Sequence, residues 1–303
     1  RMVLLGGFGM AVVLPLLPLA DHPLLLGVAL AFFGAALGTL DVSMNVHGAE
    51  VERIEARPLM SGFHAQFSIG TFVGAAFVTG LLTLGLRPDR AALLSALVAF
   101  VLMLPVVRRL RRTRSASAEP LAWPRGVVWL LAGLTAVAFL VEGAILDWGA
   151  LLIIDRALTA PPSAGIGFMI FSVAMVIARL TGDRMVALIG PLRMLVLGGL
   201  VTLAGLAVVL VPKAPVLALS GFALVGLGAG NVVPVLFSLA GRQTAMPAEL
   251  AITSVTITGY AGILLGPALL GFAADATDLP TAFWILFVLM TAVPLLAVRA
   301  TRE

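Results

Sequence analysis

The strings RMVLLGG at Arg1–Gly7 and RMLVLGG at Arg193–Gly199 are two copies of one segment, separated by 192 residues (193 minus 1). Frequent glycines explain single matches between apolar helices, but they do not explain a constant register over about seventy residues. The sequence therefore predicts two copies of one structural unit. The same offset, without a gap, matches Pro23 with Pro215, Gly34 with Gly226, Gly38 with Gly230, Gly70 with Gly262 and Gly74 with Gly266.

The last two matches form a pair of glycines four residues apart in each copy. Small residues at this spacing let two helices approach closely, so we expect the copies to share a packing plan. The second copy opens with apolar runs near 126–153 and 163–181, whose counterparts at this offset would precede residue 1. We therefore expect a first copy from which two helices are missing.

The composition indicates a membrane protein. Hydrophobic residues make up 61% of the chain, charged residues 11%, and the mean hydropathy is +1.13, whereas soluble domains are about 45–50% apolar and about 25% charged. A helix of about 20 apolar residues crosses the hydrocarbon core, and backbone groups in lipid must bond within their own segment, so we expect an all-α membrane protein and no β-barrel. About ten such runs lie near 2–20, 24–46, 59–85, 91–107, 126–153, 163–181, 193–212, 215–240, 250–273 and 279–298.

The positive charges predict the orientation of these helices. If Arg1 is cytoplasmic and every run crosses the membrane, only Arg87, Arg90, Arg156 and Lys213 of the 19 basic residues fall outside. This is the bias of the positive-inside rule, and it predicts that both ends of the chain face the cytoplasm. The arginines lie in short loops and form no basic face with interleaved aromatic residues, which argues against nucleic acid as a partner.

A family resemblance rests on the loops. Two six-helix halves around the basic loop Arg108–Arg114, and the string ARLTGDRMVALIGPLRM at 178–194, resemble the major facilitator superfamily. In that family a G-x-x-x-D-R-x-G-R-R-like loop follows helices 2 and 8. The second copy matches it, with altered spacing, at Gly182, Asp183, Arg184 and Arg193, and the first copy only at Arg1.

This resemblance implies the major facilitator fold, here with about ten of its transmembrane helices. The expected parts are an N-terminal half at 1–107 with helices 3–6, a basic cytoplasmic linker at 108–125, and a C-terminal half at 126–303 with helices 7–12. The strings DVSMNVHGAEVE at 41–52, SGFHAQFSIGTFVGA at 61–75 and EGAILDWGA at 142–150 resemble the YbjJ-type permeases, a bacterial inner-membrane branch, and are more distantly similar to fucose permease. The expected location is therefore the inner membrane.

Three acidic residues lie well inside the predicted spans, and they are candidates for proton coupling: Asp41, Glu142 and Asp147. Helices 4 and 7, which carry them, line the central cavity in the proteins that this chain resembles. Each buried acid costs about 2.5–3.5 kcal/mol on insertion scales, so each needs water or a hydrogen-bonding partner. A structural hydrogen bond is the alternative for all three, and Asp147 could also belong to a helix break with Trp148 and Gly149.

His64 is the fourth candidate for proton coupling. The turn near Arg53 places Asp41 level with Ala65, beside His64, if the two spans are antiparallel. A histidine titrates near pH 6.5 unless it is perturbed, so the pair could take up and release a proton. A static hydrogen bond that joins the two helices is the alternative.

Further polar residues are candidates for the substrate cavity, although such side chains also bridge packed helices for about 0.6 kcal/mol on average. These are Asn45, Gln66, Ser68, Asn231 and Ser238. The loop residues Gly182, Asp183, Arg184 and Arg193 form a candidate cytoplasmic gate, in which the acid would meet the N-terminus of a helix from the other half. The alternative is a solvated loop that only sets topology.

The sequence lacks the motifs of the common membrane enzymes and of ATP-driven pumps. There is no H-E-x-x-H, G-x-S-x-G or P-loop, and no cysteine, so we expect neither an enzyme nor an ATP-driven pump, and no cofactor or metal. We expect a secondary active transporter that moves a small solute by alternating access with proton coupling; the alternatives are an uncoupled facilitator, or a receptor or channel that does not transport. The expected partners are the lipid bilayer, protons and a neutral or cationic solute, because the spans hold no lysine and Arg179 is placed near a helix end.

Overall fold

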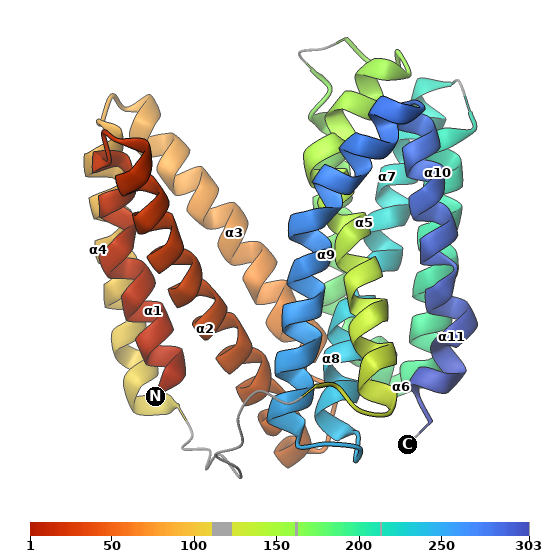
Figure 1. Ribbon diagram of the computed structural model, residues 1–303, viewed down its shortest axis with the longest axis horizontal. Helices are drawn as coiled ribbons and strands as arrows, with labels where there is room; N and C mark the ends of the chain where they lie inside the picture. Colours follow the sequence, from red (N-terminus) through yellow and green to blue (C-terminus); the bar gives the residue numbers. More distant parts are fainter. Residues whose placement is uncertain (111–122, 161–162, 213, 303) are drawn as a thin grey trace. The chain divides into compact units, whose positions relative to one another are not determined.

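The computed structural model describes residues 1–110, 123–160, 163–212 and 214–302, and within these ranges it is helical without any strand (Figure 1). This confirms the all-α prediction. In chain order the elements are α1 (Met2–Val13), the 3-10 helix η1 (Leu14–Leu19), α2 (Pro23–Glu55), α3 (Met60–Thr83), α4 (Pro88–Arg109), α5 (Val127–Asp155), α6 (Ile166–Leu210), α7 (Pro215–Ala229), α8 (Val232–Arg242), α9 (Ala248–Ala276), α10 (Leu279–Met290) and α11 (Ala292–Ala300).

The helices account for the predicted membrane spans. In the described part of the chain, nine helical stretches are long and apolar enough to cross a membrane, and one of them, α6, has 45 residues. At 1.5 Å per residue α6 would be about 68 Å long, more than twice the thickness of a hydrocarbon core. It holds both of the runs predicted near 163–181 and 193–212, and it therefore provides two spans.

A glycine separates the two spans of α6. Gly190 has φ 81° and ψ 162°, which only glycine adopts readily, and Pro191 follows it. The sequence predicted a loop from 182 to 192, but the chain stays helical up to this break. A hydropathy pattern marks where the hydrocarbon ends, whereas a helix can continue beyond it as long as its backbone groups remain bonded.

The described residues form two compact units. The first comprises Arg1–His47 and the described residues of Gln66–Ala116, and the second comprises Gly48–Ala65 and the described residues from 117 onward. The end of α2, the turn after it and the start of α3 thus belong with the helices of the second copy. Most of the predicted linker at 108–125 lies outside the described residues.

The first unit is held together by contacts between α1, α2 and α4. A methyl group added to Gly6 of α1 would lie 2.6 Å from the backbone nitrogen of Leu40 in α2, so these two helices need a glycine where they meet. On another side of α1 the Phe8 ring lies 4.9 Å from the Phe100 ring of α4.

In the second unit α6 packs along α7 and α5 packs along α9. A Cβ on Gly221 of α7 would lie 2.6 Å from Val209 N in α6, and a Cβ on Gly262 of α9 would lie 2.5 Å from Ala136 O in α5. Such close approach is expected of glycine-lined helix contacts in membranes. The matching glycines of the first copy, Gly70 and Gly74, have no described atom within 4 Å of a Cβ position, so this pair of glycines is closely packed only where it occurs in the second copy.

Candidate functional site

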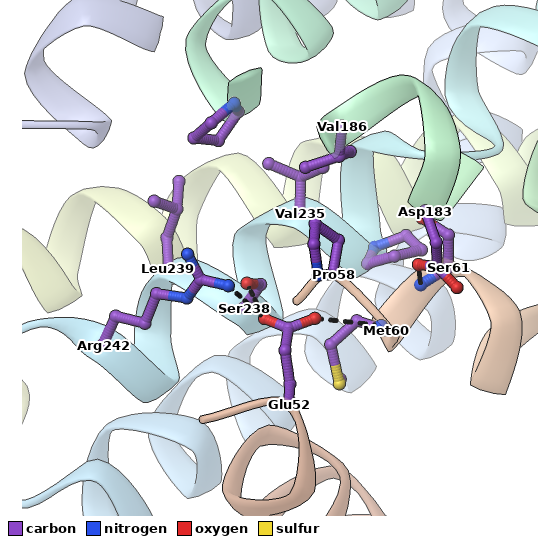
Figure 2. A pocket seen from close by; sticks show the side chains of 12 residues that line it. Glu52, Pro58, Met60, Ser61, Asp183, Val186, Val235, Ser238, Leu239 and Arg242 are labelled. Carbon is purple, nitrogen blue, oxygen red and sulfur yellow. Dashed lines mark hydrogen bonds and ion pairs between the residues drawn. The ribbon is translucent and has the colours of Figure 1, made fainter. Parts of the chain in front are cut away.

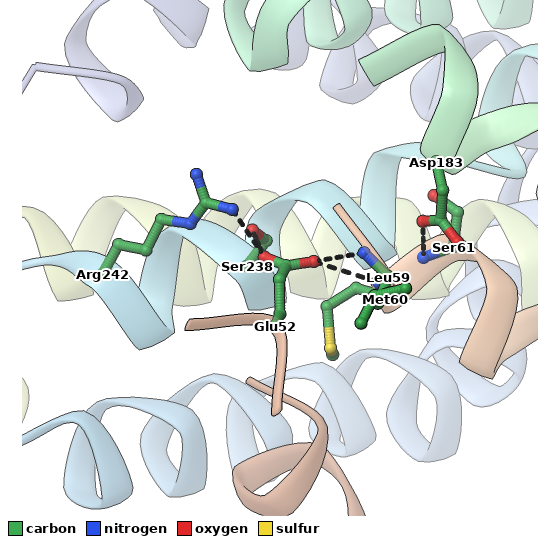
Figure 3. A network of polar contacts seen from close by, with 7 residues as sticks. All are labelled: Glu52, Leu59, Met60, Ser61, Asp183, Ser238 and Arg242. Carbon is green, nitrogen blue, oxygen red and sulfur yellow. Dashed lines mark hydrogen bonds and ion pairs between the residues drawn. The ribbon is translucent and has the colours of Figure 1, made fainter. Parts of the chain in front are cut away.

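The first amide groups of α3 point at two carboxylates from other helices. Glu52, near the end of α2, accepts hydrogen bonds from Leu59 N at 2.8 Å and Met60 N at 3.0 Å, both at Oε2 (Figure 3). A helix leaves its first four N–H groups without internal partners and carries a partial positive charge at this end. Glu52 thus binds two of the amide groups at the start of α3 and offsets part of the positive charge there.

Asp183 of α6 caps the other half. Its Oδ1 accepts from Ser61 N at 2.9 Å and its Oδ2 accepts from Gly62 N at 2.8 Å. Hydrogen bonds from backbone amides to a carboxylate are charge-assisted and about twice as strong as neutral ones. We call these contacts of Asp183, together with those of Glu52, the α3 clasp.

Two glycines bring the backbones close enough for the clasp. A Cβ on Gly62 would lie 2.6 Å from Asp183 Oδ2. A Cβ on Gly182 would lie 2.6 Å from Ser61 Cβ and would overlap Asn231 Oδ1. Real Cβ atoms do not approach other atoms so closely, so both positions require glycine for this geometry.

The second oxygen of Glu52 binds α8. Oε1 accepts from Ser238 Oγ and, at 2.9 Å, from Arg242 Nη2. The Glu52 side chain is 2% exposed, whereas the Arg242 side chain is 47% exposed. One buried carboxylate therefore joins the turn between α2 and α3 to the end of α8.

A small pocket lies beside these contacts (Figure 2). Its free volume is about 20 Å³, which is enough for roughly one water molecule. Glu52, Asp183 and Arg242 supply its charged groups, and Pro191, next to the break in α6, is part of its wall. This free space is too small for a solute of several non-hydrogen atoms.

A second polar cluster lies around Arg179 of α6. Its Nη2 is 3.3 Å from both carboxylate oxygens of Glu142 in α5, and the two side chains are only 6% and 14% exposed. Its Nε donates to Gly230 O at 3.1 Å. Pro234 has no N–H to offer the carbonyl four residues before it, which is Gly230 O, so Arg179 replaces the missing helical bond.

Asn231 makes a reciprocal hydrogen bond to α6. While Arg179 binds the carbonyl of Gly230, Asn231 Nδ2 donates to the carbonyl of Ala178 at 2.8 Å. Each side chain thus binds the residue next to the other, which ties α6 to the interruption between α7 and α8. Asn231 is 3% exposed, and its Oδ1 bonds to no described residue but lies against Gly182.

The clasp includes two of the four residues proposed as a gate. Gly182 and Asp183 take part in it, whereas Arg184 and Arg193 are exposed and make no hydrogen bond or ion pair with a described residue. Ser238, proposed for the substrate cavity, binds Glu52, and Asn231 binds α6 as described.

The remaining candidates are distributed over both units. Asp41 and Asn45 lie on α2 in the first unit, where Asn45 Nδ2 donates to Asp41 O at 3.0 Å. His64 belongs to the second unit, with its ring 5.7 Å from that of Phe237. Asp147 is exposed on α5 and has no partner among the described residues. Gln66 and Ser68, on α3 in the first unit, are exposed and partly exposed.

Three residues of the clusters were absent from the sequence-based set: Glu52, Arg179 and Arg242. Glu52 and Arg242 lie at the ends of apolar runs, where the sequence predicts loops. The sequence predicts a helix end near Arg179, but α6 continues for 11 residues from Arg179 to the break at Gly190, and the side chain is buried. Two signals were available: a basic residue within an apolar run needs a buried acid, and Pro58 marks the helix start that follows Glu52.

No family model matches the chain. It is 41% identical over 305 residues to an uncharacterised MFS-type transporter of Yersinia pestis, with 99% of this chain and 79% of that one covered. It is 32% identical over 285 residues to an uncharacterised transporter of Sinorhizobium fredii, with 90% and 74% covered. A third relative, membrane protein MosC of Rhizobium meliloti, is 28% identical and covers 88% of this chain and 65% of its own length.

Solved structures share the fold. FucP in the outward conformation has a TM-score of 0.78 at 16% identity and covers 100% of this chain and 83% of its own. The human organic anion transporter MFSD10 has a TM-score of 0.76 at 15% identity, with 97% and 76% covered. The fold of FucP thus accommodates all of the described helices of this chain.

Proposed function

The chain belongs to the major facilitator superfamily of secondary transporters, and on that premise we propose that it moves a small neutral or cationic solute across a bacterial inner membrane by alternating access, coupled to protons. Two of the relatives are named as transporters, which fits a protein without enzymatic activity. The strings that resemble YbjJ-type permeases support the inner-membrane location.

The α3 clasp is the observation that carries this proposal. Asp183 belongs to the second copy of the repeat and the first turn of α3 belongs to the first copy, yet the two are hydrogen-bonded. Alternating access requires the two copies to separate at one side of the membrane at a time. We assign the clasp the role of a cytoplasmic gate, since the predicted topology puts the segment around Asp183 inside the cell.

The charges of the second unit support a neutral or cationic solute. Among the described residues Arg179 is the one basic side chain that is buried, and Glu142 neutralises it. Its Nε is also bonded to Gly230 O. An anionic solute would have to displace these partners, whereas a neutral or cationic solute would not.

We propose Asp41, His64 and Glu142 as the groups that couple transport to protons, with Asp147 as a further carboxylate. The alternative is that they are structural, and the ion pair of Glu142 with Arg179 gives that alternative weight for this residue. An uncoupled facilitator would then replace the coupled transporter.

The test begins by finding a solute from a panel of neutral and cationic compounds, through the rise in thermal stability that binding produces. Proteoliposomes are then assayed for uptake driven by a pH gradient and for exchange between equal solute pools. We expect Asp41→Asn, His64→Gln and Glu142→Gln to lose gradient-driven uptake while exchange persists. If all three variants accumulate the solute as the parent protein does, the transporter is an uncoupled facilitator.

A further inference from the structure

We infer that Glu52 is the second carboxylate of the gate, a positioning residue that latches the turn between α2 and α3 onto α8 through Ser238 and Arg242. This rests on the gate assigned to Asp183 above. It adds a second attachment point on a different helix, at a residue that the loop motif of the family does not include.

The two oxygens of Glu52 have separate partners. Oε2 accepts from Leu59 N and Met60 N within the same turn, and Oε1 accepts from Ser238 Oγ and Arg242 Nη2 on α8 (Figure 3). The first pair of bonds keeps the turn folded. The second pair connects the turn to another helix, and it is this pair that must break if the turn moves away.

The partners on α8 are placed for this contact. Ser238 and Arg242 are four residues apart and so lie on one face of the helix. On Gly241, the residue before Arg242, a Cβ would lie 2.8 Å from Ala49 Cβ, so α2 and α8 are in contact one turn before Glu52. The carboxylate therefore reaches both donors without leaving its own turn.

Burial gives the latch its strength. The Glu52 side chain is 2% exposed, so its charge depends on protein donors rather than on water. A nearby ion pair on the same helix is a useful contrast: Glu50 binds Arg53 at 2.7 Å, but their side chains are 32% and 64% exposed. Exposed pairs contribute little, so Glu50 provides a matched control.

The test uses a reporter cysteine in the pocket. Val235 lines the pocket, is 2% exposed and lies on α8, and the chain has no cysteine of its own. In the Val235→Cys protein, the rate of reaction with a membrane-impermeant maleimide measures how often the pocket opens. The reagent is added to inside-out membrane vesicles, which expose the cytoplasmic side.

We expect Glu52→Gln to raise the labelling rate by about tenfold, the change that one lost hydrogen bond to a charged group makes in an opening equilibrium. Ser238→Ala and Arg242→Gln remove donors to Oε1 only, so they should raise the rate while the turn keeps its cap. Asp183→Asn should also raise it, and Glu50→Gln should leave it unchanged.

The remaining outcomes overturn the inference in distinguishable ways. If Asp183→Asn raises the rate and Glu52→Gln does not, the gate stands without Glu52. If Glu52→Gln raises it while Ser238→Ala and Arg242→Gln match the Glu50→Gln control, Glu52 only caps its own turn. If Asp183→Asn has no effect either, the gate itself is wrong and the latch with it.

Discussion

Single polar residues in the second unit compensate for what the backbone of a membrane helix lacks. Pro234 leaves Gly230 O without its usual donor, and the Arg179 guanidinium provides one. The same guanidinium balances the charge of Glu142. Each of these groups would be costly alone in an apolar bundle, so we expect their contributions to stability to be strongly coupled.

A double-mutant cycle tests this coupling. Glu142→Gln and Arg179→Met should each lower the free energy of unfolding by about 3–5 kcal/mol, because each leaves one buried charge without its partner. The double variant should lose clearly less than the sum of the two. Thermal and denaturant unfolding in detergent measures the effect, with Asp147→Asn, an exposed acid on the same helix, as the control. A Glu142→Gln protein as stable as the parent would contradict the prediction.

The candidate site could be predicted only in part, for a reason that applies to single residues. A carboxylate within an apolar run is conspicuous in a sequence, which is why Glu142 was identified. Glu52 and Arg242 lie at helix ends, where charges are common, and they are 190 residues apart. Their contact depends on tertiary packing, which one sequence does not encode in any local pattern.

Among the elements, α6 shows most clearly what an apolar pattern predicts. Its two spans were predicted because a membrane requires about 20 apolar residues, and this requirement is local. The same pattern predicts a loop between them, because polar residues such as Asp183 and Arg184 interrupt the apolar run, but this segment is helical up to Gly190. The position of the break depends on the backbone conformation of Gly190, which hydropathy does not report.

Replacement of Gly190 by alanine isolates the cost of that conformation. No described atom lies within 4 Å of a Cβ at this position, so Gly190→Ala would strain the backbone at φ 81° without a clash. We expect a loss of about 1–3 kcal/mol in stability. Gly165→Ala is the control, because Gly165 has φ −64° and equally open surroundings. Equal melting temperatures for the two variants would show that the break can relocate without cost.

The start of α10 should depend on pH. Asp278 is its N-cap and accepts from Thr281 N at 2.6 Å, and hydrogen bonds from the Thr281 hydroxyl and amide hold the pKa of Asp278 below its usual value. A carboxyl group whose pKa is lower in the folded state than in the unfolded state stabilises the folded protein when it is ionised. This contribution is fully present above the unfolded-state pKa, about 3.9, and it is lost as the pH falls through the folded-state pKa.

Asp278→Ala should therefore lower the melting temperature at pH 7 and have a progressively smaller effect below about pH 4. Melting curves in detergent between pH 3 and pH 7 provide the measurement. Asp275→Ala is the control, since Asp275 is exposed and has no hydrogen-bond partner among the described residues. A difference between parent and Asp278→Ala that stays constant with pH would rule out the ionised cap.

At the scale of the whole molecule, charge distribution predicts how the chain crosses the membrane. The positive-inside rule places the C-terminus in the cytoplasm and the connection after α5 outside. The absence of cysteine makes single reporters possible at Thr301 and Thr159. We expect an impermeant maleimide to label Thr301→Cys in inside-out vesicles and Thr159→Cys in right-side-out vesicles. The reverse pattern would invert the topology and place the α3 clasp on the outer side.

The two glycines of the clasp also have a genetic consequence. Every amino acid other than glycine has a Cβ, so any base change in a glycine codon that alters the amino acid adds at least this atom. Neither Gly62 nor Gly182 has room for it. Gly133 and Gly165 have no described atom within 4 Å of a Cβ position, so a small side chain fits at either of them. In a library of random point mutations, inactivating alleles should therefore be more frequent at codons 62 and 182 than at codons 133 and 165.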